Sequence, residues 1–440
     1  MKTQFAIILA LTFLMAGTAC AQRPAGQNTP PKTDTKAEQK PAQECQPVSL
    51  GEANAPDQKP AFEGQTRTCG VKTAAPIAVT VLAKGLEKPW AVEPMPDGSF
   101  LITEKAGRLR IISADGKVGE PIEGLLPVGE GGPPAESSVG GLPPIAAERQ
   151  GGLLDVALSP NFEKDRTIFW SFSERREGGN GTSAARGVLS ADGRKLSDVR
   201  VIFRGMPTYP NGMHFGSRLA FAADGKLFIT LGDRFDKNSM RPLAQDLKSH
   251  NGKVVRIDPD GTVPADNPFA GQEGAEGNIW SVGHRNIQSA TVDDQGRLWT
   301  VEHGPRGGDE LNLIEAGKNY GWPVISYGEE YTGEAIPGGI TAKDGMEQPV
   351  YYWDPVIAPS GMEFYTGSAF PEWKGNIFVG GLASKRLVRL VIKDNRVTGE
   401  EHLLTDRGQR IRDVRQGPDG FLYVVTDESN GELWRIAPGK

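Results

Sequence analysis

The sequence predicts an all-β protein, a six-bladed β-propeller, because one short pattern recurs six times along the chain. Each copy is a turn followed by a strand in which apolar and polar residues alternate. The copies occupy residues 98–103, 166–171, 225–230, 296–301, 375–380 and 420–425. The chain also contains 56 Gly and 33 Pro residues, which is typical of a protein with many turns.

The boundaries and spacing of these strands support the propeller. An Asp-Gly turn introduces three of them, at residues 97–98, 224–225 and 419–420. With positions 101, 169, 228, 299, 378 and 423 as markers, the intervals are 68, 59, 71, 79 and 45 residues, the size of blades with loops of variable length. No stretch of about 12 or more residues repeats its apolar positions with a helical period. The alternatives to a closed propeller are a large β-sandwich or two separate β-domains.

The first 21 residues predict an export signal peptide. Lys2 precedes the apolar run 5–15, which is too short to span a bilayer, and small residues follow at 16–19. Either cleavage follows Ala21, or Cys20 is lipidated as the first mature residue. We therefore expect an exported, periplasmic protein, which contacts the membrane as an outer-membrane lipoprotein only if Cys20 carries lipid.

Between the signal and the propeller, residues 22–44 are polar and Pro-rich and predict a disordered tether. Residues 45–76 predict a small irregular flap. Cys45 and Cys69 would pair most simply in an oxidising compartment, and two free thiols are the alternative. The propeller itself is expected at residues 77–437. The formal net charge of −6 and the lack of a long basic run argue against nucleic-acid binding. Whether the protein is a monomer or a dimer stays open.

Loops rich in charged residues and histidine flank the repeats, most of all within residues 280–322. We interpret this stretch as the wall of a binding site. The cations Arg285, Lys385, Arg410 and Arg412 belong to three different blades. Arg410 and Arg412 are two residues apart, so on a strand they would share one face. Cations gathered in a channel need an anion, and Arg suits bidentate recognition of carboxylates. The pattern indicates a ligand with several negative charges; ordinary surface charge is the alternative.

His214, one of five histidines, lies in a Gly-containing loop. Beside a channel of cations its imidazole would stay neutral at pH 7 and could accept a proton, as a general base must. An ordinary loop histidine is the alternative. Residues 304–310 combine acids with glycines, and Ca²⁺ favours such carboxylate and carbonyl oxygens. The spacing is not that of an EF-hand, so a solvated acidic turn is the alternative. The sequence has no nucleophile elbow, P-loop or His-Glu-x-x-His motif.

Taken together, the motifs resemble those of the soluble pyrroloquinoline quinone (PQQ)-dependent aldose sugar dehydrogenases, relatives of quinoprotein glucose dehydrogenase. The matching stretches run in order through residues 77–437: 151–155 (GGLLD), 214–219 (HFGSRL), 244–247 (AQDL), 283–286 (GHRN), 302–310 (EHGPRGGDE), 319–323 (NYGWP), 359–362 (PSGM) and 406–414 (DRGQRIRDV). The resemblance implies a six-bladed propeller, an aldose substrate and an external electron acceptor.

The resemblance also implies roles for individual residues. The PQQ carboxylates and carbonyls would be held by Gln150, Arg285, Asn286, Lys385, Arg410 and Arg412. His214 would take the proton of the sugar C1 hydroxyl while hydride passes to the quinone. The carbonyls of Gly304 and Pro305 would bind a Ca²⁺ ion that acts as a Lewis acid. A second, structural Ca²⁺ would use Glu310 and the Tyr320 region, with Asp309 as a further ligand.

The chain departs from the best-known glucose dehydrogenases at two positions on the sugar side of the pocket. Met213 stands where those enzymes have Asp, and His303 where they have Gln. Glucose preference therefore does not carry over, and a broad range of aldoses is the better expectation. Two other functions stay open: a Ca²⁺-dependent propeller lactonase, which would use carboxylates without a cation cluster, and a non-catalytic propeller that binds ligands or proteins.

Overall fold

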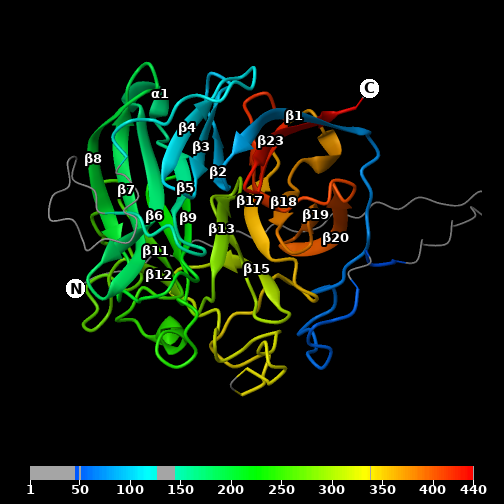
Figure 1. Ribbon diagram of the computed structural model, residues 1–440. Coiled ribbons are helices and arrows are strands. Elements are labelled where there is room, and N and C mark those ends of the chain that lie inside the picture. Colours follow the sequence, from blue (N-terminus) through cyan, green and yellow to red (C-terminus); the bar gives the residue numbers. More distant parts are fainter. Residues whose placement is uncertain (1–44, 49–50, 126–143, 337, 440) are drawn as a thin grey trace, which may run out of the picture. The chain divides into compact units, whose positions relative to one another are not determined.

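Six antiparallel sheets form the blades of a β-propeller, as the sequence predicts (Figure 1). The computed structural model describes residues 45–48, 51–125, 144–336 and 338–439. The predicted signal peptide and tether, residues 1–44, lie outside the described residues. Within the described part of the chain, no helix combines the length and apolar character needed to cross a membrane.

The blades follow one another along the chain, and the innermost strand of each comes first. The first blade contains β2 (Pro89–Pro94), β3 (Phe100–Glu104) and β4 (Arg108–Ile112). The second contains β5 (Leu153–Leu158), β6 (Thr167–Arg176), β7 (Gly179–Leu189) and β8 (Leu196–Arg204). The third contains β9 (Gly216–Phe221), β10 (Leu227–Leu231), β11 (Lys253–Ile257) and β12 (Ile279–Val282).

The remaining blades repeat this order. The fourth contains β13 (Ile287–Val292), β14 (Leu298–Glu302), β15 (Asp309–Ile314) and β16 (Tyr351–Trp353). The fifth contains β17 (Pro359–Phe364), β18 (Ile377–Gly381), β19 (Arg386–Lys393) and β20 (Arg396–Leu403). The sixth contains β21 (Ile411–Gln416), β22 (Leu422–Thr426), β23 (Gly431–Pro438) and β1 (Ile77–Leu86). The helical elements are short: α1 (Phe162–Asp165), η1 (Arg241–Gln245) and η2 (Pro371–Trp373).

The two ends of the propeller meet in the sixth blade. The blue strand β1 lies antiparallel to the red strand β23 (Figure 1), with Ile77 opposite Pro438 and Leu86 opposite Gly431. The first strand of the domain thus completes the last sheet. This pairing closes the ring, since β2 and β21 are then neighbours around the channel, as are the other successive inner strands.

The six markers all fall on the second strand of a blade, and all are buried. They are Leu101 on β3, Phe169 on β6, Phe228 on β10, Trp299 on β14, Phe378 on β18 and Tyr423 on β22. Clusters of buried residues join neighbouring blades: Phe100 of β3 packs beside Tyr423 of β22, with ring centroids 4.5 Å apart. The core is therefore a ring of interfaces between blades, where the apolar faces of the predicted strands are removed from water.

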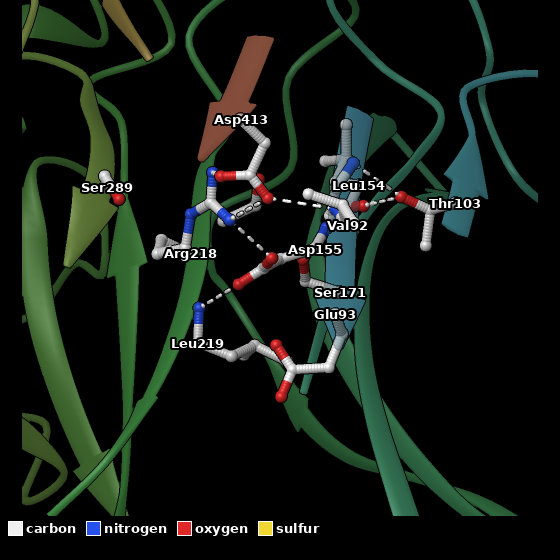
Figure 2. A network of polar contacts seen from close by, with 12 residues as sticks. Val92, Glu93, Thr103, Leu154, Asp155, Ser171, Arg218, Leu219, Ser289 and Asp413 are labelled. Carbon is white, nitrogen blue, oxygen red and sulfur yellow. Dashed lines mark hydrogen bonds and ion pairs between the residues drawn. The ribbon is translucent and has the colours of Figure 1, made fainter. Parts of the chain in front are cut away.

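The inner strands carry β-bulges that interrupt their pairing, and neighbouring blades satisfy backbone groups at these positions. The amide of Val92 donates to Asp413 Oδ2 at 3.0 Å, and that of Leu219 donates to Asp155 Oδ2 at 2.7 Å (Figure 2). Between the two carboxylates lies the fully buried Arg218, 2.7 Å from Asp155 Oδ1 and 3.1 Å from Asp413 Oδ1. This charge network joins the first, second, third and sixth blades and so fixes the strand ends that carry the site.

Ahead of β1, the described residues 45–48 and 51–76 form an irregular segment that contacts the fourth and fifth blades: the N–H of Tyr352 donates to the carbonyl of Gln65, and the N–H of Val71 donates to the carbonyl of Glu400. A disulfide bond joins Cys45 and Cys69. The carboxylate of Asp354 accepts the backbone N–H groups of Asn54 and Ala55, at 2.5 and 3.0 Å. The segment is therefore bound to the propeller by specific hydrogen bonds, although it contributes no strand to the six sheets.

Candidate active site

A cavity of about 530 Å³ opens where the loops and strand ends of the six blades converge. Its lining includes five cationic side chains and two acidic ones. The cationic residues are Lys88, Lys105, Arg149, Arg410 and Arg412, and the acidic residues are Asp427 and Glu428. An excess of positive charge around an enclosed space is the electrostatic environment that an anionic ligand requires.

Arg410 and Arg412 lie side by side in this cavity. Both guanidinium groups bind one carboxylate, that of Asp427, at 2.7 and 2.9 Å. Burial would raise the pKa of Asp427, but Arg412 and Arg410 outweigh it and lower the pKa to about 2. Lys105 is close by, and burial together with the repulsion from Arg412 lowers the pKa of its ammonium group to about 8. Asp427 offsets only part of the positive charge.

Gln150 connects the cavity to His214. The Gln150 side chain lines the cavity, and its Oε1 accepts the backbone N–H of His214 at 2.8 Å. The imidazole is buried, with Nδ1 2.7 Å from Asp233 Oδ1. The other carboxylate oxygen of Asp233 accepts the indole N–H of Trp322 at 2.8 Å. With Asp233 as the acceptor of the Nδ1–H, the Nε2 atom of His214 carries a free lone pair.

The electrostatics around His214 favour the neutral imidazole. Burial lowers the pKa of His214, and the positive charge of Arg285 lowers it further, whereas Asp233 acts in the opposite direction. Burial would also raise the pKa of Asp233, yet the charge and hydrogen bond of His214 keep it below its ordinary value. The pair is therefore a neutral imidazole held by an ionised carboxylate, an arrangement that can accept a proton at Nε2.

Arg285 and Asn286 lie beside His303, which is part of the cavity lining. The guanidinium of Arg285 donates to the carbonyls of His303 and Gly304, at 3.0 and 2.6 Å. Its buried Nε–H has no partner among the described residues. Asn286 accepts the N–H of Gly216 through Oδ1 at 3.2 Å. Burial, and to a smaller extent the positive charge of Arg285, lowers the pKa of His303 to about 3, so this imidazole is neutral as well.

A second, much smaller recess brings together four of the residues predicted to bind metal: Gly304, Pro305, Glu310 and Tyr320. Glu302 shares the recess, and both Glu302 and Glu310 accept hydrogen bonds from Asn312 Nδ2 at 3.1 Å. Burial, and then the charge of Glu302, raise the pKa of Glu310 well above its ordinary range. Arg285 lines the recess as well, and its Nη1 donates to the carbonyl of Gly304 at 2.6 Å. Among the described residues Glu310 forms no ion pair with a cationic side chain, so the recess combines two carboxylates and loop carbonyls with one guanidinium.

Other predicted residues lie differently. Asp309 is not in the recess, because its two oxygens accept the backbone N–H groups of Gly304, Ile357 and Ala358 at 2.7 to 2.8 Å. Its carboxylate thus links the loop that contains Gly304 to the loop that contains Ile357 and Ala358. Lys385 is exposed in the turn between β18 and β19 and is absent from the cavity lining, whereas Leu382 of the same turn lines the cavity. In the described part of the chain, no group of three or more His, Cys, Asp and Glu side chains has the arrangement of a metal site.

Two carboxylates that the sequence analysis did not name complete the site. Asp233 binds His214, and Asp427 binds the two arginines. Trp322, which belongs to the motif at 319–323, donates its indole N–H to Asp233, a partner 89 residues away in the sequence. Asp427 follows β22 directly, and its position at a strand end facing the channel is the only signal that could have marked it.

Comparison with known proteins places this fold and site. The family model for glucose and sorbosone dehydrogenases matches residues 86–435, most of the chain. The chain belongs to the glucose/sorbosone dehydrogenase family. The aldose sugar dehydrogenase YliI of Escherichia coli is 45% identical over 370 residues, covering 83% of this chain and 94% of that protein.

Solved structures agree with this family assignment. The soluble aldose sugar dehydrogenase of Escherichia coli in its apo-form superposes with a TM-score of 0.75 at 43% identity, covering 82% of this chain and all of that one. The PQQ-bound form of an aldose sugar dehydrogenase from Streptomyces coelicolor superposes with a TM-score of 0.63 at 28% identity, covering 83% of this chain and all of that one. The family's propeller thus extends over the six blades, whereas the segment at 45–76 precedes the part matched by the family model.

Proposed function

We propose that this member of the glucose/sorbosone dehydrogenase family oxidises aldose sugars at C1 to lactones with PQQ as its cofactor. The observation that carries the proposal is the convergence of cationic side chains on one cavity beside a neutral His214 paired with Asp233. PQQ is a planar tricarboxylate, and the PQQ-bound Streptomyces coelicolor enzyme is a relative of the same fold. Electrons would then pass to an external acceptor.

The charge of the cavity fits such a polyanion. Its lining carries five cations against two acids, so without a ligand positive charge is left uncompensated. Arg285 lines the neighbouring small recess, and its buried Nε–H is a donor without a partner among the described residues. Arg410 and Arg412 would hold carboxylates, and Gln150, Arg285 and Asn286 the other polar edges. Lys385 would be a further PQQ ligand: its side chain does not line the cavity, but Leu382 of the same turn does.

When bound, PQQ supplies the two-electron acceptor that takes hydride from C1 of the sugar. The chain's own contribution is proton transfer: Nε2 of His214 accepts the proton of the C1 hydroxyl, and the negative charge of Asp233 stabilises the imidazolium that results. Asp233 also holds the ring orientation, since its oxygens are fixed by Trp322 and by the N–H of Phe235. Gln150 fixes the backbone of His214.

Ca²⁺ would be the metal of this enzyme, bound by oxygen atoms of the small recess. The chemistry of the donors fits, because two carboxylates and the loop carbonyls of Gly304 and Pro305 are the hard oxygen ligands that Ca²⁺ prefers. A calcium ion there would supply Lewis-acid polarisation and would relieve the repulsion between Glu302 and Glu310. The Gly304 carbonyl already accepts a hydrogen bond from Arg285, and its second lone pair stays available.

The direct test adds PQQ and Ca²⁺ to the purified protein and follows the reduction of an electron-accepting dye with several aldoses. We expect dye reduction that depends on both PQQ and the sugar. His214→Ala should bind PQQ almost normally yet lose turnover on the order of 10²- to 10⁴-fold, the usual contribution of a positioned base. A wild-type protein that reduces no dye with any aldose would overturn the proposal.

We further propose that the protein is exported to the periplasm, because the sequence begins with an export signal pattern. Cell fractionation with a tagged chain tests this directly. Recovery in the periplasmic or outer-membrane fraction is expected, and recovery of the uncleaved chain in the cytoplasm would contradict it. Mass spectrometry of the mature N-terminus would distinguish cleavage after Ala21 from a lipidated Cys20.

A further inference from the structure

An aromatic side chain stands exposed beside the site. Tyr331 belongs to the long loop between β15 and β16, and 64% of its surface is accessible to solvent, the largest value among the exposed large hydrophobic residues described. Its hydroxyl group lies 3.4 Å from Nη2 of Arg285, the residue that also contacts the carbonyls of His303 and Gly304. Exposed aromatic rings at the rim of a polar site are typical of binding surfaces.

A second ring connects Tyr331 to His214. The Phe235 and His214 rings are nearly perpendicular, with centroids 5.0 Å apart, and the Phe235 and Tyr331 rings are 6.5 Å apart with a tilt of 41°. The two aromatic rings therefore extend outward from the imidazole that we assign as the base. Neither of them forms part of the described interfaces between blades.

The backbone around Phe235 is held in an unusual conformation. Arg234 and Phe235 are consecutive non-glycine residues with φ angles of 64° and 69°, in the left-handed region that side chains disfavour. Surrounding contacts hold them there: the Phe235 N–H donates to Asp233 Oδ1 at 2.7 Å, and the Arg234 guanidinium donates to Asn180 Oδ1 at 2.7 Å and stacks on Phe215. Such strain persists only where the surrounding structure fixes it, so the direction of the Phe235 side chain is fixed as well.

We propose that Phe235 and Tyr331 form an aromatic wall against which the substrate sugar packs the C–H face of its ring, with C1 toward His214. The inference rests on the proposed sugar oxidation and adds the residues that recognise the sugar. A pyranose presents hydroxyl groups at its edge and C–H groups on its faces, and aromatic rings bury such apolar faces. The hydroxyl of Tyr331 near Arg285 would keep the outer ring in place.

The wall also predicts how the enzyme selects its substrates. Packing against a C–H face depends little on which hydroxyl groups are axial or equatorial, whereas a set of directed hydrogen bonds would reject sugars that lack a partner. An aromatic wall therefore favours a broad set of aldoses over one hexose. The exposure of Tyr331 leaves the outer end of the wall open to solvent, so a further sugar unit attached to the oxidised ring would not be excluded by it.

The test measures sugar binding separately from turnover. A 1-deoxy sugar lacks the C1 hydroxyl and cannot be oxidised, so its dissociation constant can be measured by calorimetry on the protein loaded with PQQ and Ca²⁺. We expect Tyr331→Ala to weaken this binding and to raise KM for aldoses on the order of tenfold, at little change in kcat. PQQ affinity should stay within about twofold of wild type, because the ring acts on the sugar.

Two further variants control for side effects. Tyr331→Phe keeps the ring and loses only the hydroxyl, so its KM should stay near wild type. Ile340→Ala removes another exposed apolar side chain of the same loop and should change neither KM nor binding of the 1-deoxy sugar. If Tyr331→Ala binds the 1-deoxy sugar as tightly as the wild type, the wall is refuted while the dehydrogenase stands. A wild type that reduces no dye refutes the proposed function instead.

Discussion

The contact between Asp233 and His214 gives the sharpest prediction on catalysis. In Asp233→Asn the acceptor of the Nδ1–H, now 2.7 Å away, becomes an amide of nearly the same shape. An amide that turns its NH₂ toward Nδ1 stabilises the tautomer in which Nε2 carries the proton, and that Nε2 cannot act as a base. An amide that turns its oxygen toward Nδ1 keeps the tautomer but loses the negative charge that stabilises the imidazolium.

The expected size follows from these two losses. A positioned base contributes roughly 10²- to 10⁴-fold to the rate, so kcat for aldose oxidation should fall within that range. Asp233 accepts the indole N–H of Trp322 on Oδ2 and the N–H of Phe235 on Oδ1, and the single oxygen of Asn can replace only one of these two acceptors. The free energy of unfolding should therefore fall by about 1–3 kcal/mol. PQQ affinity should change little, because Asp233 does not line the cavity, and the loss of activity should be in kcat.

The pH profile adds an independent readout. The base works only as neutral imidazole, so activity falls as the pH drops through the pKa of His214. Burial lowers that pKa, and the wild-type acid limb should therefore lie below the ordinary value of about 6.5. Because the charge of Asp233 raises the pKa of His214, its removal should lower the pKa further and move the residual activity's acid limb to a lower pH.

The assay is steady-state dye reduction between about pH 4 and 9, with PQQ and Ca²⁺ saturating. Asp236→Asn is the matched control, since Asp236 lies three residues away on the same loop and bonds to Ser239 rather than to His214. Unchanged kcat in Asp233→Asn, or an acid limb that stays where the wild type has it, would refute the assignment of His214 and Asp233 as base and positioning residue.

Three further predictions concern the framework. Asp155→Ala leaves the buried Arg218 short of one carboxylate and should lower the free energy of unfolding by about 3–5 kcal/mol, measured by urea unfolding; a loss below about 1 kcal/mol would contradict the role of the charge network. Ca²⁺ should raise the melting temperature of the wild type, and Glu310→Gln should reduce this stabilisation in calorimetric scans with and without chelator; equal Ca²⁺ responses would exclude Glu310 as a ligand. Replacing Cys45 and Cys69 together by Ser removes a cross-link over 24 residues and should cost roughly 3 kcal/mol, if urea unfolding is followed under oxidising conditions; unchanged stability would show that the hydrogen bonds of the segment suffice.

The strands were predictable from sequence because alternation is a local property. The markers at Leu101 and Phe378, for example, fall on second strands of blades, buried as expected. The closure of the ring by β1 and β23 was not predictable, since it pairs Ile77 with Pro438 across almost the whole domain. The pattern of either segment alone marks a strand but does not specify its partner.

The candidate site shows the same division. The two-residue spacing of Arg410 and Arg412 predicts a shared face, and both do bind one carboxylate. That the carboxylate belongs to Asp427, and that Asp233 holds His214, depends on how distant loops meet and leaves no mark in the local sequence. Asp309 is the converse case, because an acidic loop suggests a metal ligand, yet this carboxylate accepts three backbone N–H groups.

Cationic side chains from separate blades meet in one cavity, where we propose that they bind PQQ. Isothermal titration calorimetry of the purified protein with PQQ tests this binding most directly. One PQQ should bind per chain, and Arg412→Ala should weaken binding roughly 10- to 100-fold, whereas Arg407→Ala on the preceding turn should not. An Arg412→Ala variant that binds PQQ as tightly as the wild type, or a wild type that does not bind PQQ at all, would contradict the proposed role of the cavity.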